Sequence, residues 1–155
     1  MHSEELTFKI SLSGTYHSKV PEYSILLDEQ VIQKSAILKS SEEIEDIEFK
    51  ATLTDGPHQL KIRLENKESS DTLKDNYDSE DYQIIGDMLL NIEDIEIDEI
   101  ALGQLLWDSE YILDEPQMLN GELTTSIDHC VNLGWNGTYV LNFSSPFYIW
   151  LLEKL

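Results

Sequence analysis

Basic residues are almost absent from the second half of this 155-residue sequence. Residues 1–74 contain 9 Lys and Arg against 14 Asp and Glu, a net charge of −5, whereas residues 75–155 contain Lys154 alone against 17 acids, a net charge of −16. Because such a surface repels phosphate groups, we expect no binding to nucleic acid or to anionic membranes. The charge is compatible with bound cations, with a basic protein partner, or with a surface that only keeps the protein in solution.

The sequence also predicts no internal disulfide, no membrane span and no secretion signal. The single cysteine, Cys130, excludes an internal disulfide. His129 precedes it, but we interpret Cys130 as a small buried apolar residue. No run of about 18 apolar residues is present, so we expect no transmembrane helix. The first five residues are acidic where a secretory signal would be basic and then apolar, so we expect no secretion.

Short segments of alternating apolar and polar residues predict half-buried strands over most of the chain. We place them at 6–12, 22–28, 31–38, 47–53, 58–66, 87–97 and 138–143. The turn chemistry of Thr54-Asp-Gly-Pro57 predicts a hairpin in which Glu48 and Lys50 face Lys61 and Arg63. After Ser144 or Ser145 as a cap, a short helix is expected, with Phe147, Trp150 and Leu151 docked on the sheet.

These elements indicate an all-β single domain, an antiparallel β-sandwich with a short C-terminal helix. The domain covers residues 1–155: a regular part at 6–102, an irregular excursion at 103–130, and a final strand and helix at 131–155. Within the excursion, Pro116 and Asn120-Gly121 interrupt the apolar pattern. The strand pattern leaves both a jelly roll and an immunoglobulin-like topology open.

The most distinctive stretch joins the strand at 58–66 to the strand at 87–97 through an acidic segment at 67–82. Connections of this length inside a compact domain are usually functional or disordered. In the returning strand the apolar positions slip by one residue between Ile92 and Ile95. A strand keeps both on one face only through a bulge, which we predict near Glu93-Asp94.

The spacing of this stretch resembles that of the calcium-dependent xylan-binding carbohydrate modules. The pattern consists of His58-x-Leu60-x-Ile62-x-Leu64-x-Asn66, the acidic segment, and Leu90-x-Ile92-Glu93-x-Ile95-x-Ile97-Asp98. The resemblance covers about residues 6–102 and implies a jelly-roll β-sandwich whose loop carboxylates hold calcium, which in turn contacts sugar hydroxyls. Lys67 stands where the family pattern has an Asp, Glu93 also replaces an Asp, and Glu99 replaces a Gly.

Two sets of candidate site residues follow. Calcium prefers six to eight oxygen ligands, and the candidate calcium ligands are Asp71, Asp75, Asp78, Asp81 and Asp87. The alternative is a solvated acidic loop without a metal. For stacking against sugar rings we favour Trp107 and Tyr111 among the aromatic residues, against the alternative that they pack in the core.

The tail, Leu133-Gly-Trp-Asn-Gly-Thr-Tyr to Leu152, resembles small β-sandwich proteins of tailed phages, especially those of cyanobacteria and marine bacteria. This resemblance implies a structural or decoration protein located on the virion, or otherwise in the cytoplasm of the infected host cell. Its partners would be other capsid or tail proteins, and association of several copies is left open.

We expect no enzymatic activity, because the sequence contains no nucleophile elbow, His-Glu-x-x-His or phosphate-binding loop. The leading hypothesis is a non-enzymatic phage virion protein on a carbohydrate-module-like sandwich. The alternatives are a calcium-dependent adhesion module for a surface glycan, and an acidic nucleic-acid mimic that inhibits a host protein.

Overall fold

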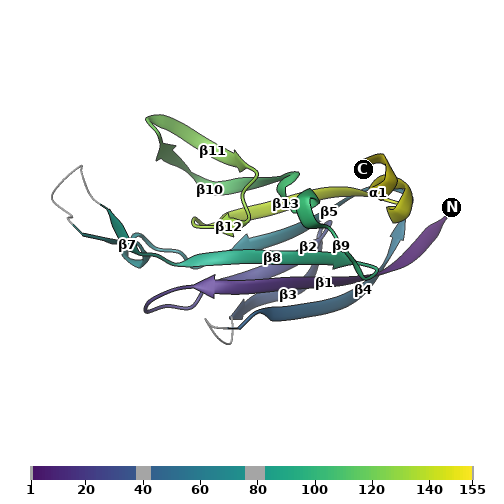
Figure 1. Ribbon diagram of the computed structural model, residues 1–155, viewed down its shortest axis with the longest axis horizontal. Coiled ribbons are helices and arrows are strands. Elements are labelled where there is room, and N and C mark those ends of the chain that lie inside the picture. The colour runs from purple at the N-terminus through teal and green to yellow at the C-terminus, as the bar shows by residue number, and fades with distance from the viewer. Residues whose placement is uncertain (1, 38–42, 76–82, 155) are drawn as a thin grey trace.

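Two antiparallel sheets face each other across one apolar core (Figure 1). The structure, a computed structural model, describes residues 2–37, 43–75 and 83–154. The five-stranded sheet has the order β12–β8–β1–β4, with β9 paired to β8. Its strands are β1 (Ser3–Thr15), β4 (Glu45–Thr54), β8 (Leu89–Ile97), β9 (Ile100–Ala101) and β12 (Asn132–Leu133).

The second sheet has six strands in the order β11–β10–β13–β5–β2–β3. These are β2 (Glu22–Leu27), β3 (Gln30–Ile37), β5 (Gly56–Leu64), β10 (Ser109–Leu119), β11 (Glu122–Asp128) and β13 (Gly137–Ser145). A small separate sheet pairs β6 (Leu73–Lys74) with β7 (Ile84–Gly86). Two 3-10 helices, η1 (Ser69–Asp71) and η2 (Gly103–Trp107), and the helix α1 (Phe147–Lys154) complete the fold. The predicted antiparallel β-sandwich with a short C-terminal helix is confirmed.

The core forms because the alternating residues of each strand place one apolar face inward. In β1 the side chains of Leu6, Phe8, Ile10 and Leu12 are at most 1% exposed, as the pattern predicts. Phe8 stacks on Phe49 of β4 with ring centroids 4.8 Å apart, and it meets Phe143 of the opposite sheet edge-on at 6.1 Å. Full burial of such side chains contributes roughly 1.5–3 kcal/mol each.

The bulge predicted in β8 is confirmed. Opposite β8, Ser11 of β1 pairs with Asp94 while Leu12 pairs with Ile92, so Glu93 is the extra residue. Its carboxylate accepts a hydrogen bond from the Ser13 hydroxyl at 2.5 Å. The bulge keeps Ile92 and Ile95 on the same buried face, at 3% and 0% exposure.

The predicted hairpin between residues 47–53 and 58–66 is wrong. At Gly56, which has φ +121°, the chain turns from one sheet into the other. Strand β4 pairs with β1, whereas β5 pairs with β2 and β13. Lys61 therefore contacts Glu29 at 3.0 Å, and not Glu48 or Lys50. Alternation identifies the buried face of a strand but does not identify its neighbour.

The segment 103–130, expected to be irregular, contains η2 and the β10–β11 hairpin. Asn120 and Gly121 form its turn with φ angles of +52° and +81°, the combination that a tight hairpin turn requires. Strand β10 extends the six-stranded sheet, because its residues from Ser109 to Leu113 pair with β13. Beyond that point the hairpin continues past the end of the sandwich (Figure 1).

The two ends of the chain meet at the start of α1 (Figure 1). The predicted serine cap is wrong, because the Glu4 carboxylate accepts hydrogen bonds from the Phe147 N–H at 2.7 Å and the Ser145 hydroxyl at 2.9 Å. A carboxylate at a helix N-terminus also interacts favourably with the helix dipole. Phe147 and Trp150 are buried as predicted, at 0% and 7% exposure. None of the helices in the described ranges is long and apolar enough to cross a membrane.

We predict that Glu4→Ala lowers the free energy of unfolding by about 1–2 kcal/mol, since it removes two charge-assisted hydrogen bonds at the helix start. Urea denaturation measures this difference. Glu5→Ala, at the exposed neighbouring position, is the matched control and should change stability by less than about 0.5 kcal/mol. Equal losses in the two variants would contradict the capping role of Glu4.

Candidate functional site

A groove of about 1090 Å³ lies at one end of the sandwich. One wall is formed by residues within 67–74 and 84–89, which include β6, β7 and the start of β8, and the other is the distal half of β10. The short β12 and the turn before β13 lie between these walls (Figure 1). The volume reaches the upper end of the range typical for small-molecule sites, and the groove is open, so an extended ligand fits it better than a compact one.

The groove combines one large aromatic ring with exposed hydrogen-bonding groups. Trp135, half-buried against the core, contributes the ring. Glu115 and Asn132 are exposed, and Gln117 is partly exposed, which provides one carboxylate and two amides. Met118, 64% exposed on the hairpin, adds an apolar flank. The groove therefore brings hydrogen-bond acceptors, hydrogen-bond donors and an apolar ring surface together.

Arg63 of β5 fixes the base of the hairpin wall. Its guanidinium binds the Asp114 carboxylate through both terminal nitrogens, at 3.2 and 2.8 Å, and also donates to the Thr138 hydroxyl at 2.5 Å. This paired geometry orients Asp114 more firmly than a single contact would. The wall of the groove formed by β10 is therefore anchored at Asp114, where the pairing of β10 with β13 ends.

Three of the five predicted calcium ligands lie in the described residues, and the carboxylate of each accepts a hydrogen bond from another residue of the protein. Asp71 is 4% exposed and binds the Lys19 ammonium at 2.8 Å. Asp75 accepts from the Gln83 N–H at 2.7 Å. Asp87 binds the Lys67 ammonium at 2.6 Å. Asp78 and Asp81 lie outside the described residues.

Lysine nitrogens thus provide the positive charge beside Asp71 and Asp87. Burial alone would raise the pKa of Asp71, but the Lys19 ammonium and the Glu68 N–H outweigh burial and lower it. Burial is outweighed in the same way at Asp87, whose pKa is lowered by Lys67, the Thr72 hydroxyl and the Met88 N–H. A general acid for glycoside hydrolysis needs a raised carboxyl pKa, so neither Asp71 nor Asp87 suits that role.

The calcium implied by the family resemblance does not fit the Asp87 site. The oxygens there are Asp87 Oδ1 and the carbonyls of Met88 and Gly134, and all three accept hydrogen bonds from Lys67 Nζ. Calcium needs six to eight oxygen ligands. Among the described residues no group of three or more His, Cys, Asp or Glu is arranged to hold a metal ion.

The two predicted sugar-stacking residues differ in position. The prediction for Tyr111 is wrong, because its side chain is fully buried and its hydroxyl donates to the Trp135 carbonyl and accepts from the Trp135 N–H. Trp107 is 47% exposed, as a stacking residue must be, but it is not part of the groove lining. The aromatic residue that lines the groove is Trp135, a candidate that we ranked below Trp107 and Tyr111. Its flanks, Gly134 and Asn136-Gly137, mark a surface turn and were the signal available in the sequence.

Cys130 and His129 do not form a reactive pair in the described structure. The Cys130 thiol is partly buried and donates to the Asn132 carbonyl at 3.2 Å, while burial raises its pKa. His129 Nδ1 is bonded to the Trp107 carbonyl at 2.5 Å. A thiol with a raised pKa is a weak nucleophile. Cys130 was expected to be a small buried apolar residue, and it is partly buried and packed against the core.

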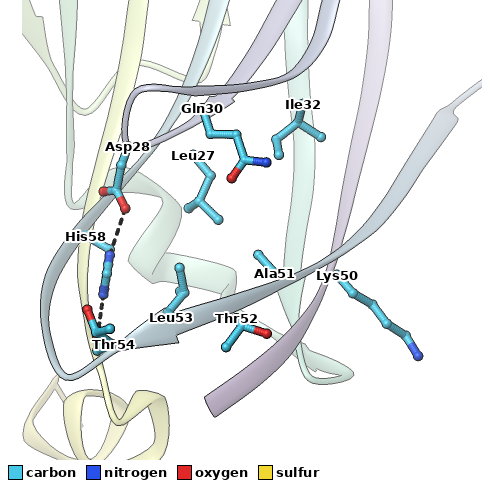
Figure 2. A pocket seen from close by; sticks show the side chains of 10 residues that line it. All are labelled: Leu27, Asp28, Gln30, Ile32, Lys50, Ala51, Thr52, Leu53, Thr54 and His58. Carbon is cyan, nitrogen blue, oxygen red and sulfur yellow. Dashed lines mark hydrogen bonds and ion pairs between the residues drawn. The ribbon is translucent and has the colours of Figure 1, made fainter. Parts of the chain in front are cut away.

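A second, smaller cavity of about 440 Å³ lies between β4 and the β2–β3 edge. His58 stands at its end, with Nδ1 bonded to Asp28 Oδ2 at 2.8 Å and Nε2 bonded to the Thr54 carbonyl at 2.6 Å (Figure 2). With both ring nitrogens engaged, no nitrogen remains to accept a proton from a substrate. His58 thus joins the β4–β5 corner to the β2–β3 turn as a structural residue.

Comparisons with known proteins give one structural resemblance. The solved structure is vCBM60, from work on circular permutation as an evolutionary link between two families of calcium-dependent carbohydrate-binding modules. It has 9% sequence identity and a TM-score of 0.49, and the alignment covers 88% of this chain and 89% of that one. No protein-family profile matches the chain, and no curated protein matches its sequence.

We predict that His58 makes stability depend on pH. Burial opposes its charge, but the Thr54 carbonyl and the Asp28 carboxylate outweigh burial and raise the pKa, with Glu4 adding to the effect. The stabilisation is full below the unfolded pKa of about 6.5 and is lost as pH rises through the folded pKa. His58→Gln should therefore lower the melting temperature more at about pH 5.5 than at about pH 8.5.

The control is His2→Gln, at an exposed position near the N-terminus, which corrects for the general effect of pH on this acidic protein. A melting-temperature deficit of His58→Gln that stays constant across this range, or grows with pH, would show that the imidazolium is not the stabilising form.

Proposed function

We propose that this protein is a non-catalytic module that binds a glycan chain in the groove beside Trp135. The observation that carries the proposal is the position of Trp135 in an open groove together with Glu115, Gln117 and Asn132. Sugar rings present apolar C–H faces that stack on indole, and hydroxyl groups that pair with carboxylate and amide oxygens. The open ends suit an internal segment of a polysaccharide.

The charge of the groove restricts the class of glycan. Four acids, Glu68, Asp87, Asp114 and Glu115, line it together with Lys67 and Lys74, and Asp87 and Asp114 are paired with Lys67 and Arg63. The protein as a whole has a net charge of −21. Because like charges repel sulfate and uronate groups, the expected ligands are neutral polysaccharides.

Glycan arrays followed by calorimetry on the best ligand test this function. Trp135→Ala should weaken binding at least tenfold, since it removes the stacking surface. Trp107→Ala is the matched control, because Trp107 is an exposed tryptophan outside the groove lining, and it should leave affinity unchanged. Glu115→Ala and Asn132→Ala remove exposed hydrogen-bonding groups with little effect on folding, and each should weaken binding several-fold.

Two outcomes would reject the groove as the binding site: equal affinity of Trp135→Ala and wild type, or a loss of binding in Trp107→Ala instead. A preference for sulfated glycans would contradict the expectation of neutral ligands. Circular dichroism of each variant separates a loss of binding from a loss of fold.

The virion role implied by residues 133–152 stays a prediction, as do its capsid or tail partners and its location. The structure uses part of this tail for β13 and α1, whose buried residues serve the core. Mass spectrometry of purified virions tests that role. Inhibition of a host protein by nucleic-acid mimicry has charge alone in its support, and no feature of the groove favours it.

A further inference from the structure

Lys67 lies three residues after the end of β5, and its ammonium group is enclosed by oxygen atoms. Nζ donates to Asp87 Oδ1 at 2.6 Å, to the Met88 carbonyl at 2.9 Å and to the Gly134 carbonyl at 2.9 Å. An ammonium group has three donors, so these three acceptors satisfy it completely. The side chain is only 8% exposed, so this charge is buried beside the groove and is paired.

The backbone of Lys67 is fixed as firmly as its side chain. Its N–H donates to Asn136 Oδ1 at 2.7 Å, and the Asn136 amide donates back to its carbonyl at 3.0 Å. One residue therefore connects the end of β5, the start of β8 and the turn before β13. In many proteins a bound metal ion joins separate segments in this way.

The oxygens around Nζ suit a monovalent cation and not a divalent one. They carry a single negative charge, that of Asp87. Asp87 Oδ1 also accepts from the Thr72 hydroxyl and the Met88 N–H, both at 2.8 Å, so its lone pairs are already used by donors. A calcium ion would need to displace the ammonium and then find at least three further oxygen ligands.

We propose that the Lys67 ammonium is the built-in structural cation of the groove, in the role that calcium is expected to fill, and that the groove binds its glycan without divalent cations. The second half of this statement rests on the proposed function. Lys67 is a positioning residue: it holds the turn with Gly134 and Asn136, and thereby Trp135, against the wall formed by Asp87.

The first test uses thermal unfolding of the wild-type protein with calcium chloride or with a chelator. The expected result is the same melting temperature in both conditions. A dose-dependent rise with calcium would overturn the proposal, because a ligand that binds only the folded state must stabilise it.

The second test compares Lys67→Met with Lys50→Met, at an exposed position of β4. Loss of the buried ammonium should lower the melting temperature by on the order of 10 °C, and loss of the exposed one by about 2 °C or less. Equal effects would overturn the proposal. If Lys67→Met does not fold, the melting temperature of Asp87→Asn, which weakens the same contact, is compared with that of Asp75→Asn. The larger decrease is expected for Asp87→Asn.

The third test measures affinity for the glycan found on the array, with calcium or with a chelator. Equal affinities support binding without divalent cations, and binding that requires calcium overturns it. If no glycan binds in either condition, the proposed function fails, whereas the two unfolding experiments still decide the role of Lys67.

Discussion

The connection between β5 and β8 must cross from one sheet of the sandwich to the other, and the groove depends on how that crossing is held. Near the start of this connection, Lys67 is bonded to Asp87, which lies near its end, and to the turn at Gly134. Charged groups with so little exposure are stable in a folded protein only when they are paired and fully hydrogen-bonded. The contact therefore fixes both ends of a long polar segment and one wall of the groove together.

Much of the fold could be predicted from the sequence because alternation reports burial directly. The inward positions of β1, such as Leu6 and Phe8, and the bulge at Glu93 follow from apolar spacing alone. Strand partners do not follow from it. Whether β4 continues into a hairpin or turns a corner at Gly56 is decided by the packing of two sheets, which a local pattern does not contain.

The site was less predictable, because its groups come from segments far apart in the chain. The acidic residues suggested a metal site, but whether a carboxylate faces a calcium ion or a lysine depends on its neighbour in space. Lys67 departs from the family pattern, and its contact with Asp87 gives that departure a physical meaning. Tyr111 and Trp135 show the same limit, since sequence alone does not tell which ring is buried.

The most direct measurement is the nitrogen-15 NMR spectrum of the lysine ammonium groups, with and without calcium. Exposed ammonium protons exchange with water too fast to be seen, whereas one held by three hydrogen bonds exchanges slowly. We predict a protected signal that Lys67→Met removes and that calcium leaves unchanged. The absence of a Lys67 signal, or its disappearance when calcium is added, would contradict the role of Lys67 as the cation of the groove.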